Sequence, residues 1–473
     1  KIDLYAANLT RNVSFETENG KNVPISHRAH VMLMHNPNVK VFNAGFYDLG
    51  RSDKSKLVDD IGRNVDGSIG RGTNIRGRYA LHLHLTGLDP KQAVLLKGNA
   101  VSGSPGWGIV QHESRAGLED NVVFDTKGAG ITAESGNETG WWTGNTSIKT
   151  TGVRWDIADR QREFRERKFD FGFEGDGFWV QGAAQIANRD NVAISSNRTG
   201  MSLFGGSLEL DDFRPIETIP VASLPPETRK LFAKGQTEVD IRLVPMVTVS
   251  GFEGYNNNTG IEVWGHKTNF DGELAFGDGK SEDEIRTAHK GRSRIENFTT
   301  WGNRWSGVDV KYSSNIDVKN GLVAGIDDSD RNSGGRGVFV NHATFNSVID
   351  NVNIQGFNEG AHFEQINSDQ NNNNNTLQYS TLKNNTYHLS KVANEKLDNN
   401  RNDDFNAFVR MRNNRFEVKQ ATALPLLNSA LKGLAGSALS SMPVAPMTLT
   451  HISPKMGDLN PLRAKASLLT AGM

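Results

Sequence analysis

Three residues that can transfer protons or bind a metal recur at the same place in successive strand-like segments. The segments read RGRYALHLHLTG, SPGWGIVQHES and NVVFDTKGAGITAESGNE, and aligning their apolar cores places His84, His112 and Glu134 in one column. The steps along the chain are 112 − 84 = 28 and 134 − 112 = 22 residues. Because alternate side chains of a strand share a face, His82 lies on the same side as His84. The spacing predicts a polar column on the outside of stacked coils.

The histidines of this column are spaced for a metal site. His82 and His84 are two residues apart on one predicted strand, and His112 stands one coil, about 4.8 Å, away. We therefore expect one divalent ion, zinc or copper rather than calcium, with Glu134 or His30 as a further ligand. The alternative is a stack of surface histidines that are bonded to neighbouring carboxylates.

The column also permits catalysis without a metal. Glu134 and Glu138 form a carboxylate pair, and glycosidases use such a pair with one group protonated and the other ionised. Under this hypothesis both glutamates are catalytic. The alternative is that they stabilise a turn.

A polysaccharide lyase needs a different set of residues. His84 or His112 would act as the base. Arg78 or Arg115 would neutralise the carboxylate of a uronate sugar. These four residues are therefore further candidates for catalysis and substrate binding.

Aromatic and cationic residues continue the outer face beyond the histidines. Trp179, Trp264 and Lys311 are predicted to point outward and to bind sugar rings. The alternative is that both tryptophans pack beneath inserted loops.

The elements that position these residues are short strands separated by glycine and asparagine corners. Glycine permits sharp corners, and asparagine tolerates left-handed backbone and stacks its amide on the next coil. The absence of helices between φ-x-φ strands indicates parallel coils, which we predict to wind right-handed. We expect an all-β fold, a single-stranded parallel β-helix over residues 1–420. The expected insertions are about 52–77, 141–175, 208–243 and 266–294, and 421–473 are expected to form a short helical cap and linker.

The inward positions of these strands predict the core. The residues expected in stacked aliphatic columns are Ile109, Val123, Ile131, Ile261, Val263, Val308, Val310, Val338 and Val340.

Composition narrows the function. The 473 residues carry a net charge of −1, which gives no field that favours nucleic acid. No cysteine is present, so disulfides and thiolate metal sites are excluded, and no apolar run is long enough to span a membrane. The chain begins at Lys1, from which we expect a segment of a longer protein with an upstream domain.

The chain resembles the parallel β-helix region of the G8-domain family, which includes hyaluronan-binding proteins of the cell surface. The resemblance covers about residues 1–205. It rests on DLYAANLTRNVSF, HVMLM, GRYALHLHLTG, residues 121–138 and GFWVQG. One departure is Ala129, where the family has a histidine.

The resemblance implies a secreted or cell-surface protein that binds or cleaves glycans, and we expect a bacterial origin. The predicted function is a hyaluronidase-like or uronate-polymer-degrading enzyme that uses the His/Glu column. The alternative is a non-catalytic glycan-binding or adhesive module of a larger surface protein. In both cases the expected partner is a polysaccharide or cell-surface glycan.

Overall fold

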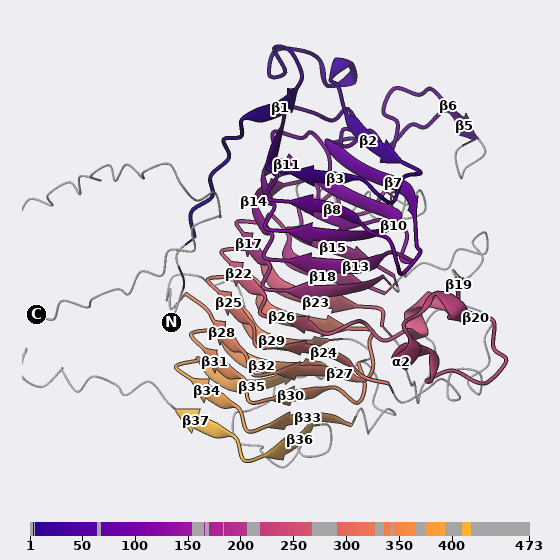
Figure 1. Cartoon of the computed structure of the whole chain (residues 1–473). Helices are drawn as coiled ribbons and strands as arrows, with labels where there is room; N and C mark the ends of the chain where they lie inside the picture. The colour runs from indigo at the N-terminus through magenta and orange to yellow at the C-terminus, as the bar shows by residue number, and fades with distance from the viewer. Residues whose placement is uncertain are drawn as a thin grey trace, which may run out of the picture.

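The computed structural model describes residues 3, 5–63, 68–153, 165, 170–182, 184–205, 218–266, 291–326, 335–341, 344–364, 374–392 and 409–417. The described chain winds into parallel coils that stack from the indigo N-terminal end to the yellow C-terminal end (Figure 1). Each coil adds strands to sheets that run along the stack. The predicted parallel β-helix is confirmed.

The first sheet, called sheet A here, has 12 parallel strands. In spatial order they are β1 (Val13–Glu16), β4 (Ala44–Tyr47), β9 (Ala100–Ser102), β11 (Val122–Lys127), β14 (Thr146–Thr151), β17 (Val192–Ile194), β22 (Glu253–Tyr255), β25 (Thr299–Trp301), β28 (Leu322–Ala324), β31 (Asn353–Gln355), β34 (Thr381–Lys383) and β37 (Arg415–Glu417).

Sheet B carries the predicted histidine column. Its strands are β2 (Val31–Met34), β7 (Leu81–Gly87), β10 (Ile109–Glu119), β12 (Ile131–Ala133), β15 (Phe178–Gln181), β18 (Thr199–Phe204), β23 (Thr259–Trp264), β26 (Ser306–Lys311), β29 (Arg336–Asn341), β32 (Glu359–Glu364) and β35 (Tyr387–Val392).

Sheet C completes the coils and shares β10, which bends from sheet B into sheet C. Its other strands are β3 (Lys40–Phe42), β8 (Val94–Lys97), β13 (Thr139–Thr143), β16 (Gln185–Arg189), β21 (Val249–Ser250), β24 (Ser293–Glu296), β27 (Ile316–Lys319), β30 (Val348–Asp350), β33 (Asn375–Gln378) and β36 (Val409–Arg412).

Short elements outside the coils lie mainly in the insertions. They are the antiparallel pairs β5 (Gly62–Arg63) with β6 (Ile69–Gly70) and β19 (Thr218–Pro220) with β20 (Glu238–Asp240), and the helical turns η1 (Ile25–His27), η2 (Val221–Ser223), α2 (Pro226–Arg229) and η3 (Ile241–Leu243).

Buried asparagines form a ladder at one corner of the coils. The amide Nδ2 of Asn121 donates to the Leu96 carbonyl oxygen and to Asn145 Oδ1, both at 2.9 Å. Asn99 and Asn191 continue the same pattern on the neighbouring coils. The ladder satisfies backbone groups that the corner withdraws from sheet hydrogen bonding, so it fixes the register of successive coils.

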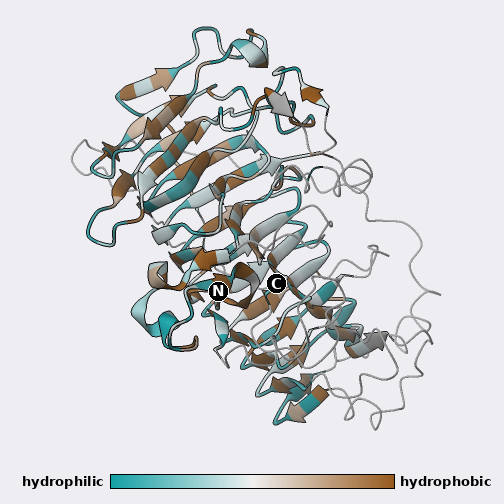
Figure 2. Cartoon of the chain, turned by 90° about the vertical axis from the view of Figure 1, so that its right-hand side faces the viewer, coloured by the Kyte–Doolittle hydropathy of each residue, from teal (hydrophilic) through white to brown (hydrophobic). Residues whose placement is uncertain are grey.

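The inside of the coils is filled by stacked aliphatic side chains. All nine predicted core residues are at most 2% exposed and belong to one apolar cluster. Hydrophobic and hydrophilic residues alternate along the strands, as Figure 2 shows by hydropathy. The strand alternation read from the sequence therefore has the correct phase.

The predicted boundaries of the insertions need correction at two places. Residues 141–151 are not an insertion, because β13 and β14 pair with neighbouring coils and Trp142 is fully buried in the core. The WW pair hides the usual alternation there, since a large aromatic side chain occupies an inward position. The first described strand after residue 266, β24, begins at Ser293, one residue before the predicted end of the last insertion. The predicted cap and linker at 421–473 lies outside the described residues.

We expect Ile131→Asp to prevent folding, because it places an unpaired charge in a dry aliphatic column. Lys127→Asp, at an exposed position of the neighbouring strand β11, is the matched control and should fold normally. Soluble yield and thermal melting followed by circular dichroism measure both. A cooperative Ile131→Asp variant with the wild-type melting temperature would contradict the assigned register.

Candidate functional site

The predicted column forms where β7, β10 and β12 lie side by side in sheet B. His84 pairs in register with His112, as the sequence predicted. Ala133 pairs with Gln111, and the Glu134 amide donates to the Gln111 carbonyl oxygen at 3.0 Å, so Glu134 lies against His112. The parallel register of three coils thus builds the site.

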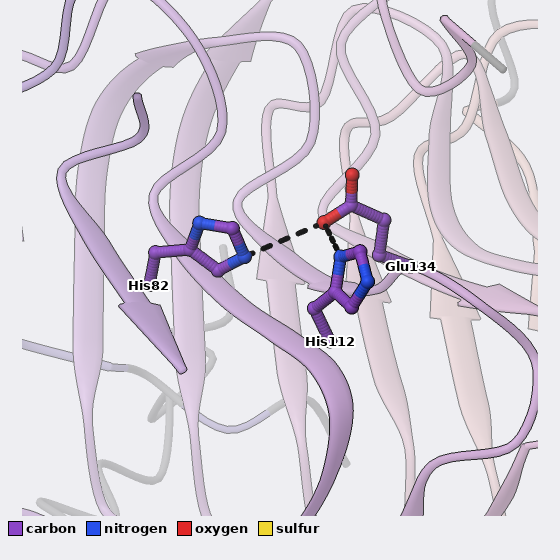
Figure 3. A group of neighbouring side chains, drawn as sticks. All are labelled: His82, His112 and Glu134. Carbon is purple, nitrogen blue, oxygen red and sulfur yellow. Dashed lines mark hydrogen bonds and ion pairs between the residues drawn. The ribbon is translucent and has the colours of Figure 1, made fainter. Parts of the chain in front are cut away.

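Glu134 draws two imidazoles together (Figure 3). Its Oε2 lies 2.9 Å from His112 Nδ1 and 3.5 Å from His82 Nε2. The three residues offer ligand atoms that all lie within 4.8 Å of one another. His82 is buried, whereas the side chains of His112 and Glu134 are 23% and 14% exposed. The group, called the His/Glu site below, therefore has one face that solvent reaches.

The hydrogen bonds of His82 leave one nitrogen directed at a carboxylate. Its Nδ1 lies 2.9 Å from the Gly77 carbonyl oxygen, which accepts only from a protonated nitrogen. The Nε2 atom is buried and has no hydrogen-bond partner among the described residues. In the neutral imidazole its lone pair would face Glu134 Oε2, so either a proton or a metal ion must lie between them. The donor set fits a divalent transition metal.

Glu134 and His112 contact each other most closely, and their opposite charges shift the pKa of both groups. Burial would raise the pKa of Glu134, but the hydrogen bond from His112 and the charges of His82 and His112 lower it far below its usual range. Burial would lower the pKa of His112, but the hydrogen bond and charge of Glu134 raise it to about 9. Without a metal, the pair is an ion pair at neutral pH.

His84 stands beside the compact group and is not part of it. Its ring centroid lies 4.6 Å from that of His112 and 5.1 Å from that of His82. Its Nδ1 is buried and has no hydrogen-bond partner among the described residues. Burial and the two neighbouring imidazoles lower the pKa of His84, which keeps it neutral. A neutral, unpartnered imidazole beside the group suits a general base.

His30 is a weaker candidate as a ligand. It lies near His82, but Arg51 and Arg78 are also close, and burial together with these charges lowers its pKa to about 4. His30 is outside the compact group of ligand atoms. Arg78 is thus close to His30.

Glu138 and Arg115 do not join the site. The Glu138 carboxylate is fully buried and accepts hydrogen bonds from the backbone N–H groups of Ser135 and Gly136, both at 2.7 Å, and of Glu113 at 3.1 Å. This arrangement favours the structural alternative, a carboxylate that stabilises the turn after β12. Arg115 follows the bend of β10 into sheet C and lies 5.8 Å from the Trp141 ring.

A roof of inserted residues covers part of the outer face. Lys54 Nζ bonds Asp170 at 2.6 Å and lies 3.7 Å from the Trp107 ring centroid. Phe171 stacks on Trp107 and on Trp179, with ring centroids 5.4 and 5.3 Å apart. Trp179 therefore packs beneath an inserted loop, the alternative that the sequence left open. None of the roof residues was predicted, although Trp107 and Phe171 lie beside glycine-rich segments that suggest close packing.

Trp264 and Lys311 belong to a second polar group, on strands five and six coils from the strand of His84 and so roughly 24–29 Å away. Lys311 Nζ lies 2.7 Å from Glu262 and 3.8 Å from the Trp264 ring centroid. Arg198 forms ion pairs with Glu262 and, at 2.8 Å, with Asp176. We call Asp176, Arg198, Glu262, Asp309 and Lys311 the carboxylate cluster.

Burial and charge separate the acids of the carboxylate cluster. Burial would raise the pKa of Glu262, but Arg198 and Lys311 lower it to about 2. Burial raises the pKa of Asp309 to about 7 and that of Asp176 to about 6, because the cations compensate these two acids less. Asp309 therefore keeps its proton to higher pH than the neighbouring Glu262.

Comparisons with known proteins add only remote likenesses. No family model matches the chain, and no curated protein matches it. Among solved structures it is similar to a hyperthermoactive exopolygalacturonase from Thermotoga maritima, with 11% identity, a TM-score of 0.35, and coverage of 85% of this chain and 78% of that one.

Two other likenesses are weaker. A family 28 exopolygalacturonase of Yersinia enterocolitica has 10% identity and a TM-score of 0.29, over 71% of this chain and 47% of that one. A periplasmic alginate epimerase has 8% identity and a TM-score of 0.27, over 71% of this chain and 76% of that one. Likenesses this remote carry no argument about function, and the membership in the G8-domain family stays a prediction. In the described residues, no helix has the length and apolar character needed to cross a membrane.

The raised pKa of Asp309 predicts a pH-dependent stability. The folded pKa of about 7 lies above the ordinary aspartate value of 3.8, so the carboxyl group stabilises the fold below about pH 3.8, and this contribution is lost as the pH rises to 7. We expect Asp309→Asn to gain stability relative to the wild type between pH 4 and 7, with the gain constant above about pH 7. Urea unfolding at several pH values measures the difference. Parallel curves for the two proteins would contradict the assignment.

Proposed function

We propose that the protein cleaves a uronate-containing polysaccharide at the His/Glu site, with a zinc or copper ion held by His82, His112 and Glu134. The observation that carries the proposal is the convergence of these ligand atoms within 4.8 Å, with an orphaned His82 Nε2 among them. The exposed side of His112 leaves room for a further ligand, as catalytic metal sites require.

The residues available at the site favour β-elimination over hydrolysis. Hydrolysis of a glycosidic bond needs two carboxyl groups, and Glu138 is occupied by three backbone N–H groups. Elimination needs one base and a cation near the uronate carboxylate. The bound ion would supply that cation, which acidifies the C5 proton of the sugar.

His84 is the proposed base. Its neutral imidazole takes the C5 proton, the electron pair forms the C4–C5 double bond, and the C4–O bond breaks. The departing oxygen takes a proton from solvent, which balances the reaction. Arg78, which lies close to His30, is proposed to bind another uronate of the chain.

The choice of polysaccharide has independent support. The resemblance of GRYALHLHLTG to a glycan-active family includes the histidine strand itself. The site also lies on a long face of stacked coils, along which an extended polymer can align. A purely adhesive module is less well supported, because Trp179 is covered by Phe171 and offers no open aromatic platform.

The location of the protein stays part of the proposal. A polymer of this kind lies outside the cytoplasm, so we propose a secreted or cell-surface protein. The absence of cysteine is compatible with that location in bacteria.

The metal is tested by isothermal titration of the chelator-treated protein with zinc and with copper. We expect one ion per chain. His112→Ala and Glu134→Gln should weaken binding by more than the 10–100-fold that loss of an outer hydrogen-bond partner costs, because each removes a ligand. His27→Ala, an exposed histidine of η1, is the matched control and should bind as the wild type does. Equal affinity in His112→Ala and the wild type would contradict the site.

The reaction is tested with hyaluronan, alginate and polygalacturonate, by the ultraviolet absorbance of unsaturated ends. We expect the absorbance to appear with one of these polymers, to stop on chelation and to return with added zinc. His84→Ala should lower the rate on the order of 10²–10⁴-fold, because the base is lost, while metal content and melting temperature stay nearly unchanged. A fall in activity that only follows a fall in stability would instead indicate a structural histidine.

A further inference from the structure

The carboxylate cluster contains an acid pair that the His/Glu site does not use. Glu262 on β23 and Asp309 on β26 pair in register on adjacent coils, so their side chains leave the sheet about 4.8 Å apart. Both residues are 4% exposed. Asp309 Oδ1 and Asp176 Oδ2 are buried and have no hydrogen-bond partner among the described residues.

An ion-pair network with a purely structural role would have given hydrogen-bond partners to Asp309 Oδ1 and Asp176 Oδ2. Buried carboxylate oxygens without partners cost free energy, so a fold that needed the charges only for stability would pair them or replace them with apolar residues. Here Arg198 and Lys311 both form ion pairs with Glu262. Among the described residues, no cation donates a hydrogen bond to Asp309. The two acids are therefore held in unlike environments at neighbouring positions.

We infer that Glu262 and Asp309 form a second, metal-independent centre that hydrolyses a glycosidic bond of a uronate-containing glycan. Retaining glycosidases hold their two carboxyl groups about 5 Å apart, one as the nucleophile and the other as the acid, and side chains of residues paired in register on adjacent strands can reach that separation. The inference goes beyond the proposed function and does not depend on the His/Glu site.

The reaction at this pair balances in two steps. Asp309 donates its proton to the glycosidic oxygen while that C–O bond breaks, and the Glu262 carboxylate attacks the anomeric carbon to form a glycosyl ester. Water then attacks the same carbon, gives its proton to the Asp309 carboxylate and releases Glu262.

Lys311 and Trp264 control access to the pair. Lys311 is 16% exposed and holds Glu262 while its Nζ lies against the Trp264 ring. A uronate carboxylate that binds Lys311 would draw the ammonium group away from Glu262 and from the Trp264 ring. This movement frees the Glu262 nucleophile and uncovers the face of Trp264 for the sugar ring. This exchange selects an acidic glycan over a neutral one.

The test uses the full chain treated with a chelator, so that the His/Glu site is inactive. Hyaluronan, alginate and polygalacturonate are incubated with it, and reducing ends are counted alongside unsaturated ends. We expect reducing ends without ultraviolet absorbance. Absence of such ends with all three polymers would overturn the inference, while chelator-sensitive unsaturated ends would leave the proposed function standing.

Variants assign the roles. Asp309→Asn should lower hydrolysis on the order of 10²–10⁴-fold. Asp317→Asn is the matched control, since Asp317 is about equally buried but is ion-paired to Arg292 and lies on sheet C, and it should retain the activity. Lys311→Met should raise KM for the uronate polymer with a smaller change in kcat. Wild-type hydrolysis by folded Asp309→Asn would overturn the inference.

Chemical rescue of a Glu262 variant tests the nucleophile independently of Asp309. Glu262→Ala with added azide should form a glycosyl azide, because azide takes the place of the missing nucleophile. Mass spectrometry detects that product. A folded Glu262→Ala protein that hydrolyses at the wild-type rate without azide would also overturn the inference.

Discussion

Parallel hydrogen bonding between successive coils is the constraint on which the rest of this structure depends. It places equivalent positions of neighbouring coils about 4.8 Å apart, so residues 22 to 60 positions apart in the chain become contacts in one column. The buried asparagine ladder maintains that register at the corner. A slip of one residue would exchange the aliphatic interior for the polar exterior, which is why both polar sites depend on the ladder.

The roof over sheet B changes the chemistry of that outer face. Lys54, Arg165 and Asp170 are buried together, and such a group repays its desolvation only when the ion pairs are well formed. The three residues come from two insertions, so the pairing holds both loops against the coils. Because Glu134 and His82 are largely buried, the charges there interact more strongly than on an open sheet.

The two polar sites of sheet B compensate their buried charges in opposite ways. At the His/Glu site, one carboxylate is shared by two imidazoles, so the group is poor in negative charge and rich in nitrogen ligands. In the carboxylate cluster, several acids lie near the cations Arg198 and Lys311. The cations stabilise the charge of Glu262 more than that of Asp309, so Asp309 keeps its proton to higher pH. Metal binding suits the first arrangement and proton transfer suits the second.

The sequence by itself determined the fold class, the phase of the core and the register of His84 with His112. These follow from local alternation and from glycine and asparagine corners, which act over a few residues. It did not reveal that Glu138 is used by the turn, because three backbone N–H groups converge on it only after the chain bends.

The tertiary structure alone decided which polar residues are close together. Of the two histidines of β7 predicted as ligands, only His82 belongs to the compact group, and its ring is held by the Gly77 carbonyl oxygen, a contact that strand parity does not encode. Arg198 joins Glu262 across 64 positions, and Phe171 covers Trp179 from an insertion. Strand alternation specifies which way a side chain points, but the loops that cross the sheet determine what it meets there, and those loops carry no periodic signal.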